Sequence, residues 1–236
     1  MKLLCLPHSG SSACCYLKWR NMLDKEIEVI PVEFPGRGKR FAENLSQNMP
    51  ELVENLYNYI KNEIGDSEYA VFGHSLGGLV AYELIIKMLE KGHRAPVHLF
   101  VSGCNAPHIK YKRDLLHKLP NNQFFEHILA LGGMAEEVVS NEELLEVFIP
   151  IIKADYKIYE TYTSRLEPIK LGVDVTVFTG DSDPLVTIEN VNEWSLYTYM
   201  MFKVNVFNGG HFFLYERSEE VIHKINQTLL VQSTGR

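Results

Sequence analysis

The chain has 236 residues, a length typical of one large domain or of one domain that carries an insertion. Hydrophobic residues make up 46% of the chain and charged residues 22%, as in ordinary soluble globular proteins. The net charge of −7 disfavours nucleic acid and anionic membranes as partners, because both require a basic protein surface.

Short strands and helices alternate through the first part of the chain. Apolar runs predict strands at residues 3–6, 28–32, 69–72 and 98–102. Apolar residues at helical spacing predict helices at 14–23, 49–64 and 78–91. Because the strands are continuously apolar rather than alternating, we expect an α/β protein with a mostly parallel central sheet, flanked by helices on both faces.

The middle of the chain lacks a convincing strand. Helices are expected around 122–131, 141–147 and 151–163, separated by Gly132-Gly133 and by Pro150. Three helices without an intervening strand favour an insertion over ordinary crossover helices. We therefore predict a core of residues 1–106 and 166–236 and a helical lid insertion at 107–165, called the lid below.

The alternation resumes after the lid. The expected elements are a strand at 173–179, a helix at 188–196, a strand at 203–207 and a closing helix at 219–230.

The strongest chemical signal is the Gly73-His74-Ser75-Leu76-Gly77 sequence, a G-x-S-x-G pattern between a predicted strand and a predicted helix. This pattern places a serine nucleophile on a tight turn above the sheet of an α/β-hydrolase, where glycines relieve crowding. The pattern alone is short, and a structural glycine turn is the alternative. The flanking strand and helix favour Ser75 as the nucleophile. We expect His74 to pack or hydrogen bond beside the turn rather than act as the base.

The general base is expected in the loop after the last strand, since the triad order in this fold is serine, acid, histidine. Of the nine histidines, only His211 combines a late position, a preceding strand and two flexible glycines, Gly209 and Gly210. We therefore predict His211 as the base.

Two aspartates compete for the acid that orients the base. Asp183 lies farther beyond the strand end than Asp181, and its loop could reach His211. Asp181 follows Gly180 directly and is a natural turn former. Asp174 lies within the predicted strand. The sequence favours Asp183.

An oxyanion hole needs two N–H groups directed at the developing negative charge. The backbone amide of Leu76, directly after the nucleophile, is one expected donor. The second is expected from the loop after the first strand, as the amide of His8 or of Ser9; the sequence does not choose between them.

The cysteines and the N-terminus suggest a cytoplasmic protein. We expect reduced thiols, and Cys14-Cys15 lacks the spacing of a zinc site, so no metal is expected. The apolar stretch at 3–6 is too short for a signal peptide, and no window approaches 18 apolar residues. We expect a cytoplasmic monomer with no membrane span.

Several motifs together resemble the type II thioesterases of nonribosomal peptide and polyketide synthesis, over nearly the whole chain. The matching segments are 6–10 (LPHSG), 34–38 (FPGRG), 72–78 (FGHSLGG), 102–107 (SGCNAP), 127–133 (HILALGG), 178–183 (FTGDSD) and 209–213 (GGHFF). One departure is that the family usually has Ala-Gly-Gly where this chain has Ser9-Gly10-Ser11.

The resemblance implies an enzyme that removes misloaded acyl or aminoacyl groups from the phosphopantetheine arm of peptidyl or acyl carrier protein domains. It also implies a mobile helical lid and no cofactor, because the phosphopantetheine belongs to the carrier. The catalytic chemistry would be formation and hydrolysis of an acyl-enzyme on Ser75.

Three other interpretations fit parts of the sequence. A general carboxylesterase or acyl-CoA thioesterase would use the same triad. A cyclising thioesterase cut from a synthase is disfavoured by the start at Met1, so close to the first strand. A carrier-binding pseudo-hydrolase would usually lack a triad member. Apolar lid residues would suit an acyl pocket, although most could be helix core: Phe124, Phe125, Ile128, Phe148 and Ile152.

Overall fold

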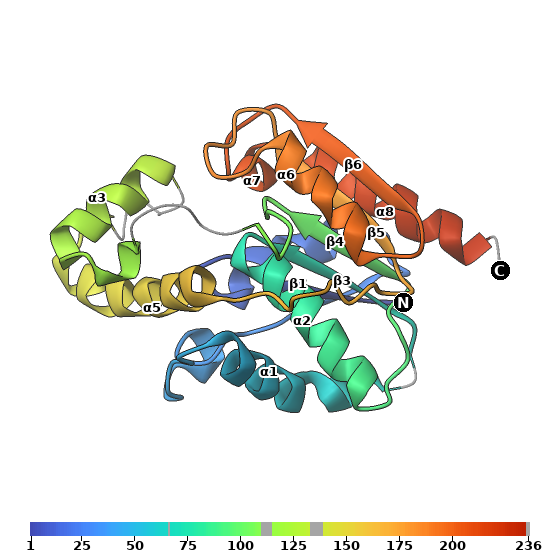
Figure 1. Ribbon diagram of the computed structural model, residues 1–236, viewed down its shortest axis with the longest axis horizontal. Helices are drawn as coiled ribbons and strands as arrows, with labels where there is room; N and C mark the ends of the chain where they lie inside the picture. The colour runs from blue at the N-terminus through green and yellow to red at the C-terminus, as the bar shows by residue number, and fades with distance from the viewer. Residues whose placement is uncertain (66, 110–114, 133–138, 235–236) are drawn as a thin grey trace.

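A single six-stranded sheet organises the molecule (Figure 1). The computed structural model describes residues 1–65, 67–109, 115–132 and 139–234. The strands are β1 (Lys2–Leu6), β2 (Glu28–Pro31), β3 (Tyr69–His74), β4 (His98–Ser102), β5 (Asp174–Gly180) and β6 (Phe202–Phe207). They pair in the order β2-β1-β3-β4-β5-β6, and every pair is parallel, which confirms the predicted parallel sheet.

Helices cover both faces of this sheet, because alternate side chains of each strand point to opposite faces. Leu4 and Leu6 of β1 join one core cluster, whereas Leu3 and Cys5 join another. The first cluster includes residues of α1 (Met49–Ile64), α2 (Leu76–Glu90), α6 (Ile188–Asn192) and η4 (Glu193–Tyr197). The second includes residues of η1 (Ala13–Asn21), α7 (Phe213–Glu216) and α8 (Ser218–Thr234).

Helix α1 shows how the sequence fixes these elements locally. The Asn48 side chain accepts a hydrogen bond from the Glu51 amide at 2.9 Å, which satisfies a free N–H at the helix start. Leu52, Leu56 and Ile60 then recur on one buried face. Burying such a face, at about 1.5–3 kcal/mol for each large apolar side chain, holds the helix on the sheet.

Two predicted α-helices have a different local form. The segment predicted at 14–23 lies mostly in the 3-10 helix η1, where Tyr16 and Trp19 are three residues apart and pack edge to face with ring centroids 4.9 Å apart. Residues three apart eclipse in a 3-10 helix, so both rings can enter the same core. The predicted helix 188–196 divides into the α-helix α6 and the 3-10 helix η4.

The lid contains η3 (Leu116–Lys118), α3 (Asn121–Leu131) and α5 (Glu142–Thr161). Figure 1 shows α3 and α5 together at one end of the sheet. Most of their buried apolar residues form a small separate cluster around Phe124, Ile128 and Ile152, whereas Ile158 of α5 joins the first core cluster. The division of the lid into three helices that Pro150 separates was wrong, because Pro150 lies inside the continuous helix α5.

Proline removes one backbone hydrogen bond from a helix and usually kinks or ends it. Here the residues on both sides of Pro150 are anchored: Ile149 and Ile152 in the lid cluster, and Ile151 by burial. Packing on this face outweighs the lost bond. Gly132 ends α3 in the left-handed conformation; Gly133, which the sequence analysis named with it, lies outside the described residues.

Cys5 and Cys104 are buried free thiols, and Cys14 is exposed. Among the residues described here, no helix has the length and apolar character needed to cross a membrane.

Candidate active site

Ser75 lies on the sharp turn between β3 and α2. Its backbone has φ 53° and ψ −120°, a strained combination for a residue with a side chain, and its amide donates to the Ser102 carbonyl at 2.7 Å. A Cβ at Gly73 would lie 2.0 Å from the Gly77 oxygen, and one at Gly77 would lie 2.4 Å from the Leu6 oxygen. Both glycines of the pattern are therefore required by close backbone contacts.

His211 and Asp183 form a buried pair although they lie 28 residues apart. His211 Nδ1 is 2.8 Å from Asp183 Oδ2, and both side chains are almost inaccessible to solvent. The other oxygen of Asp183 accepts a hydrogen bond from the Leu185 amide at 2.8 Å, which fixes the carboxylate in its loop. With Nδ1 held by Asp183, Nε2 is the ring nitrogen that remains to take a proton from a nucleophile.

Asp181 has a different environment. It accepts hydrogen bonds from the Gly209 amide at 3.0 Å and from the Ser182 hydroxyl at 2.9 Å. These bonds, led by the one from Gly209, lower the pKa of this exposed carboxyl. Asp181 therefore joins the turn after β5 to the turn after β6, and it is Asp183 that contacts the histidine.

Two further histidines surround this pair. His74 is fully buried, and its Nδ1 lies 2.9 Å from the Ser102 hydroxyl, while its ring centroid lies 5.1 Å from that of His211. Burial, with smaller contributions from His211 and His8, holds the pKa of His74 well below its ordinary value. Burial also lowers the pKa of His8 to about 4. Both are therefore neutral at pH 7 and add no charge beside His211.

The loop after β1 borders the same site. His8 Nε2 lies 2.7 Å from the Tyr215 hydroxyl, and His8 Nδ1 lies 3.0 Å from the Ser9 carbonyl oxygen. Leu76 is the first residue of α2, so its amide has no acceptor within the helix. His8 and Ser9 line the same cavity as Ser75, and a Cβ at Gly77, two residues after Ser75, would lie 2.6 Å from the Pro7 carbonyl oxygen of this loop. The oxyanion role of Leu76, and the choice between the His8 and Ser9 amides, stay predictions.

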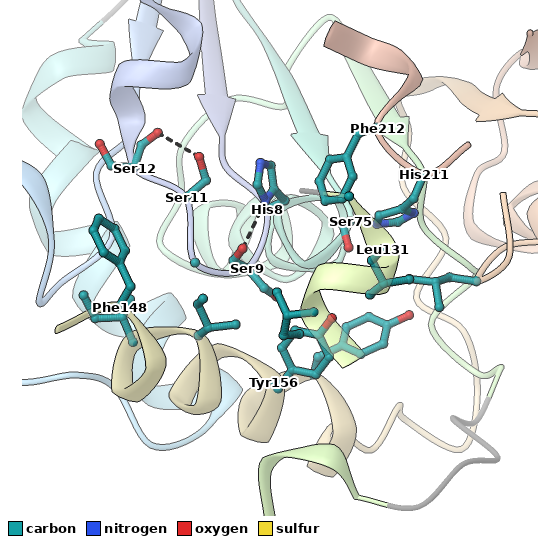
Figure 2. Close-up of a pocket in the computed structure, with 18 of the residues that line it drawn as sticks. His8, Ser9, Ser11, Ser12, Ser75, Leu131, Phe148, Tyr156, His211 and Phe212 are labelled. Carbon is teal, nitrogen blue, oxygen red and sulfur yellow. Dashed lines mark hydrogen bonds between the residues drawn. The ribbon is translucent and has the colours of Figure 1, made fainter. Parts of the chain in front are cut away.

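A cavity of about 930 Å³ lies between the carboxyl edge of the sheet and the lid helices. Ser75 and His211 line it from the core, together with His8 and Ser9. Figure 2 shows the Ser75 and His211 side chains near each other, with Phe212 beside them and Phe148 and Tyr156 of α5 on the opposite wall. The wall that the lid contributes is mostly apolar: Leu116, His127, Ile128, Leu131, Val147, Phe148, Ile151, Ile152, Tyr156 and Tyr159.

The apolar lid residues singled out from the sequence divide into two groups. Ile128, Phe148 and Ile152 line the cavity. Phe124 is fully buried inside the lid, and Phe125 packs against the same internal cluster. Those two side chains are therefore helix core rather than pocket wall.

Asp155, a buried aspartate on α5 that pairs with Arg37, was not predicted from the sequence as a functional residue. The sequence nevertheless contained an indication of both Asp155 and Arg37. Asp155 occupies a helix face whose other members, Ile151, Ile152 and Ile158, are buried apolar residues, and Arg37 belongs to the Pro-Gly-Arg-Gly segment. An acid on an apolar helix face requires a buried partner.

Residues 1–229 match the family described as a thioesterase domain. The gramicidin S biosynthesis protein GrsT of Aneurinibacillus migulanus is 34% identical over 223 residues, which cover 94% of this chain and 86% of that relative. The solved structure of ClbQ from the colibactin NRPS/PKS pathway is 38% identical, with a TM-score of 0.95 over 99% of this chain and 98% of that one. The type II thioesterase BorB from the borrelidin biosynthetic cluster is 34% identical, with a TM-score of 0.86 over 96% of this chain and 91% of that one.

Proposed function

The chain belongs to the thioesterase domain family, has the predicted α/β-hydrolase fold and is a thioester hydrolase, and we propose that it removes misloaded acyl and aminoacyl groups from carrier proteins. The groups would be attached to the phosphopantetheine arm of carrier domains in nonribosomal peptide or polyketide synthesis. Support comes from the relatives, which include a protein of gramicidin S biosynthesis and a type II thioesterase of the borrelidin cluster.

The observation that carries the mechanism is the buried His211–Asp183 pair beside Ser75. In this proposal, His211 takes the Ser75 proton as the hydroxyl attacks the thioester carbonyl, and Asp183 stabilises the imidazolium that forms. The pantetheine thiol leaves with a proton from His211, which gives an acyl-enzyme on Ser75. His211 then activates a water molecule that hydrolyses this ester.

The oxyanion of each tetrahedral intermediate would be stabilised by the Leu76 amide and by the amide of His8 or Ser9. The aligned peptide units of α2, which begins at Leu76, add a favourable field at this position. Loss of one such donor typically lowers kcat by about 10²–10³-fold.

The acyl group would occupy the cavity under the lid, for which we propose residues 107–165. No aspartate or glutamate lines this cavity within the part of the chain that the structure describes. An uncharged acyl chain therefore suits it better than a long cationic one, because an unpaired charge is costly in an apolar site. A volume of about 930 Å³ is within the range of pockets that hold an elongated ligand.

We propose that the enzyme needs no cofactor of its own, since the triad and water suffice and the phosphopantetheine comes with the carrier. We also propose a cytoplasmic monomer whose partners are peptidyl or acyl carrier domains. The four free cysteines support a reducing compartment.

The test compares hydrolysis of acetyl, alanyl and octanoyl groups from a phosphopantetheinylated peptidyl carrier protein with hydrolysis of the corresponding acyl-CoA and p-nitrophenyl esters. Ser75→Ala is the control. We expect a higher kcat/KM on the carrier and its loss in Ser75→Ala. Equal or faster turnover of CoA or nitrophenyl esters would instead assign the triad to a general esterase or acyl-CoA thioesterase, and a wild-type protein that binds the carrier without turnover would be a pseudo-hydrolase.

A further inference from the structure

Asp155 of the lid helix α5 accepts three hydrogen bonds in the protein interior. Arg37 donates two of them, from Nη1 at 2.5 Å and from Nη2 at 2.8 Å. The third comes from the backbone amide of Gly10 at 2.7 Å. The side chains of Asp155 and Arg37 are only 2% and 5% exposed. Three charge-assisted bonds of this kind are what a buried carboxylate requires, and they define its position tightly.

The third bond matters because Gly10 belongs to the loop after β1. The backbone at Gly10 has φ +76°, and a Cβ there would lie 2.5 Å from Cγ1 of Ile152 on α5. The loop therefore lies directly against the lid helix, closely enough that only glycine fits. Contact with Ile152 and the bond to Asp155 both fix this loop from the lid side.

The core holds the same loop from its other end. His8 Nε2 lies 2.7 Å from the Tyr215 hydroxyl of α7, next to the catalytic His211 loop. Ser9 lies between the two attachments, His8 on the core and Gly10 on the lid. The amides of this short stretch are those expected to complete the oxyanion hole, so their direction depends on both attachments.

We propose that Asp155 is a positioning residue for the oxyanion hole: by holding Gly10, it orients the loop amide that stabilises the oxyanion and makes that orientation depend on α5 being seated. The proposal rests on the proposed function of Ser75 and its loop. Asp155 itself is buried beneath the loop and paired with Arg37, so it does not touch the substrate. Movement of α5 away from the core would break the Gly10 bond and weaken oxyanion binding.

A single Asp155→Asn substitution would leave the Arg37 charge buried and unpaired, which is strongly destabilising. The test therefore removes the charge first with Arg37→Met, since replacing a buried ion pair by neutral residues is often tolerated. On this background, D155N keeps an oxygen that can accept the Gly10 N–H, whereas D155L has similar size and no acceptor. If leucine prevents folding, alanine at position 155 removes the same acceptor.

Four quantities separate positioning from a general structural role. They are kcat and KM for octanoyl thioester hydrolysis, the Ki of an octyl trifluoromethyl ketone, and the pKa of its hemiketal with Ser75, measured by ¹³C NMR. This probe forms a tetrahedral oxyanion on the serine, so it reports the oxyanion hole directly. Glu83→Gln is the matched control, because Glu83 binds Tyr162 and Arg165 just after α5 without touching the loop.

We expect R37M/D155L to lose about tenfold or more in kcat relative to R37M/D155N, with KM changed by less than about twofold. The Ki and the acidity of the hemiketal should change by the same factor, and Glu83→Gln should leave the hemiketal pKa unchanged. Equal behaviour of the leucine and asparagine variants, or a loss confined to KM, would overturn the proposal. Failure of the proposed function would look different: the wild-type protein would give no Ser75 hemiketal, or Ser75→Ala would remain active.

Discussion

Acidification should destabilise this protein through its buried histidines, and His98 allows the effect to be measured away from the active site. His98 is 3% exposed at the start of β4, with Nε2 2.9 Å from the Thr176 hydroxyl. Burial lowers the pKa of His98 from its ordinary value of about 6.5 to about 4. The folded protein therefore keeps His98 neutral over a range in which the unfolded chain binds a proton.

The sign follows from proton binding. Between pH 6.5 and pH 4 the unfolded state holds more protons than the folded state, so the free energy of unfolding falls as the pH falls. The contribution of His98 to the free energy of unfolding is complete above about pH 6.5 and is lost progressively down to about pH 4. From pH 7.5 to pH 5 one such histidine accounts for about 2 kcal/mol, at about 1.36 kcal/mol per pH unit below 6.5. That is a large part of a typical stability of about 5–15 kcal/mol.

The perturbation is His98→Gln, which removes the titrating group and keeps a side chain that can hydrogen bond to Thr176. Urea unfolding followed by circular dichroism at several pH values from 7.5 to 5 gives the free energy of unfolding. From pH 7.5 to pH 5, the free energy of unfolding should fall by about 2 kcal/mol less in the variant than in the wild-type protein. The variant should still lose some stability, because His8 and His74 are buried in the same way. Parallel pH profiles for the two proteins would refute the reasoning.

Three further outcomes are expected. Asp183→Asn should lower kcat by about 10⁴-fold in a thioester hydrolysis assay, as in serine hydrolases that lose the orienting acid, whereas Asp181→Asn should retain most activity; equal losses would contradict the assignment of the acid. Gly77→Ala should either prevent folding or displace the Ser75 side chain so that it no longer reacts, because the alanine Cβ would lie 2.4 Å from the Leu6 carbonyl oxygen. Thermal unfolding reports loss of the fold, and fluorophosphonate labelling reports loss of Ser75 reactivity. Leu131→Trp should narrow the cavity and reduce kcat/KM for octanoyl thioesters about tenfold more than for acetyl thioesters, and an unchanged chain-length profile would place the acyl chain elsewhere.

The sharp turn that carries Ser75 and the parallel sheet were predictable because local chemistry determines them. The G-x-S-x-G pattern is required by backbone atoms that approach Gly73 and Gly77 within the turn itself. Continuous apolar runs required a sheet covered on both faces, and the six described strands have that arrangement. His211 could be selected because chain order and two glycines distinguish it from the other histidines.

Other features depended on distances that a sequence does not contain. Asp181 and Asp183 differ by two positions in one loop, and only the fold brings one to His211 and the other to the Gly209 amide. Pro150 indicated a helix end, yet the packing of Ile149 and Ile152 carries α5 through it. At Pro150, the free energy gained by burying these side chains outweighs the low helix propensity of proline.

By itself, the sequence therefore determined the alternating strands and helices, the sharp turn at Ser75 and the place of His211 in the loop after the last strand, because each is encoded by contacts between residues close in the chain or by a fixed chain order. Only the tertiary structure decided that Asp155 joins Arg37, 118 residues away, to the Gly10 amide. The physical reason is that a buried carboxylate is stable only where several donors converge on it, and the folding of the lid onto the core brings those donors together.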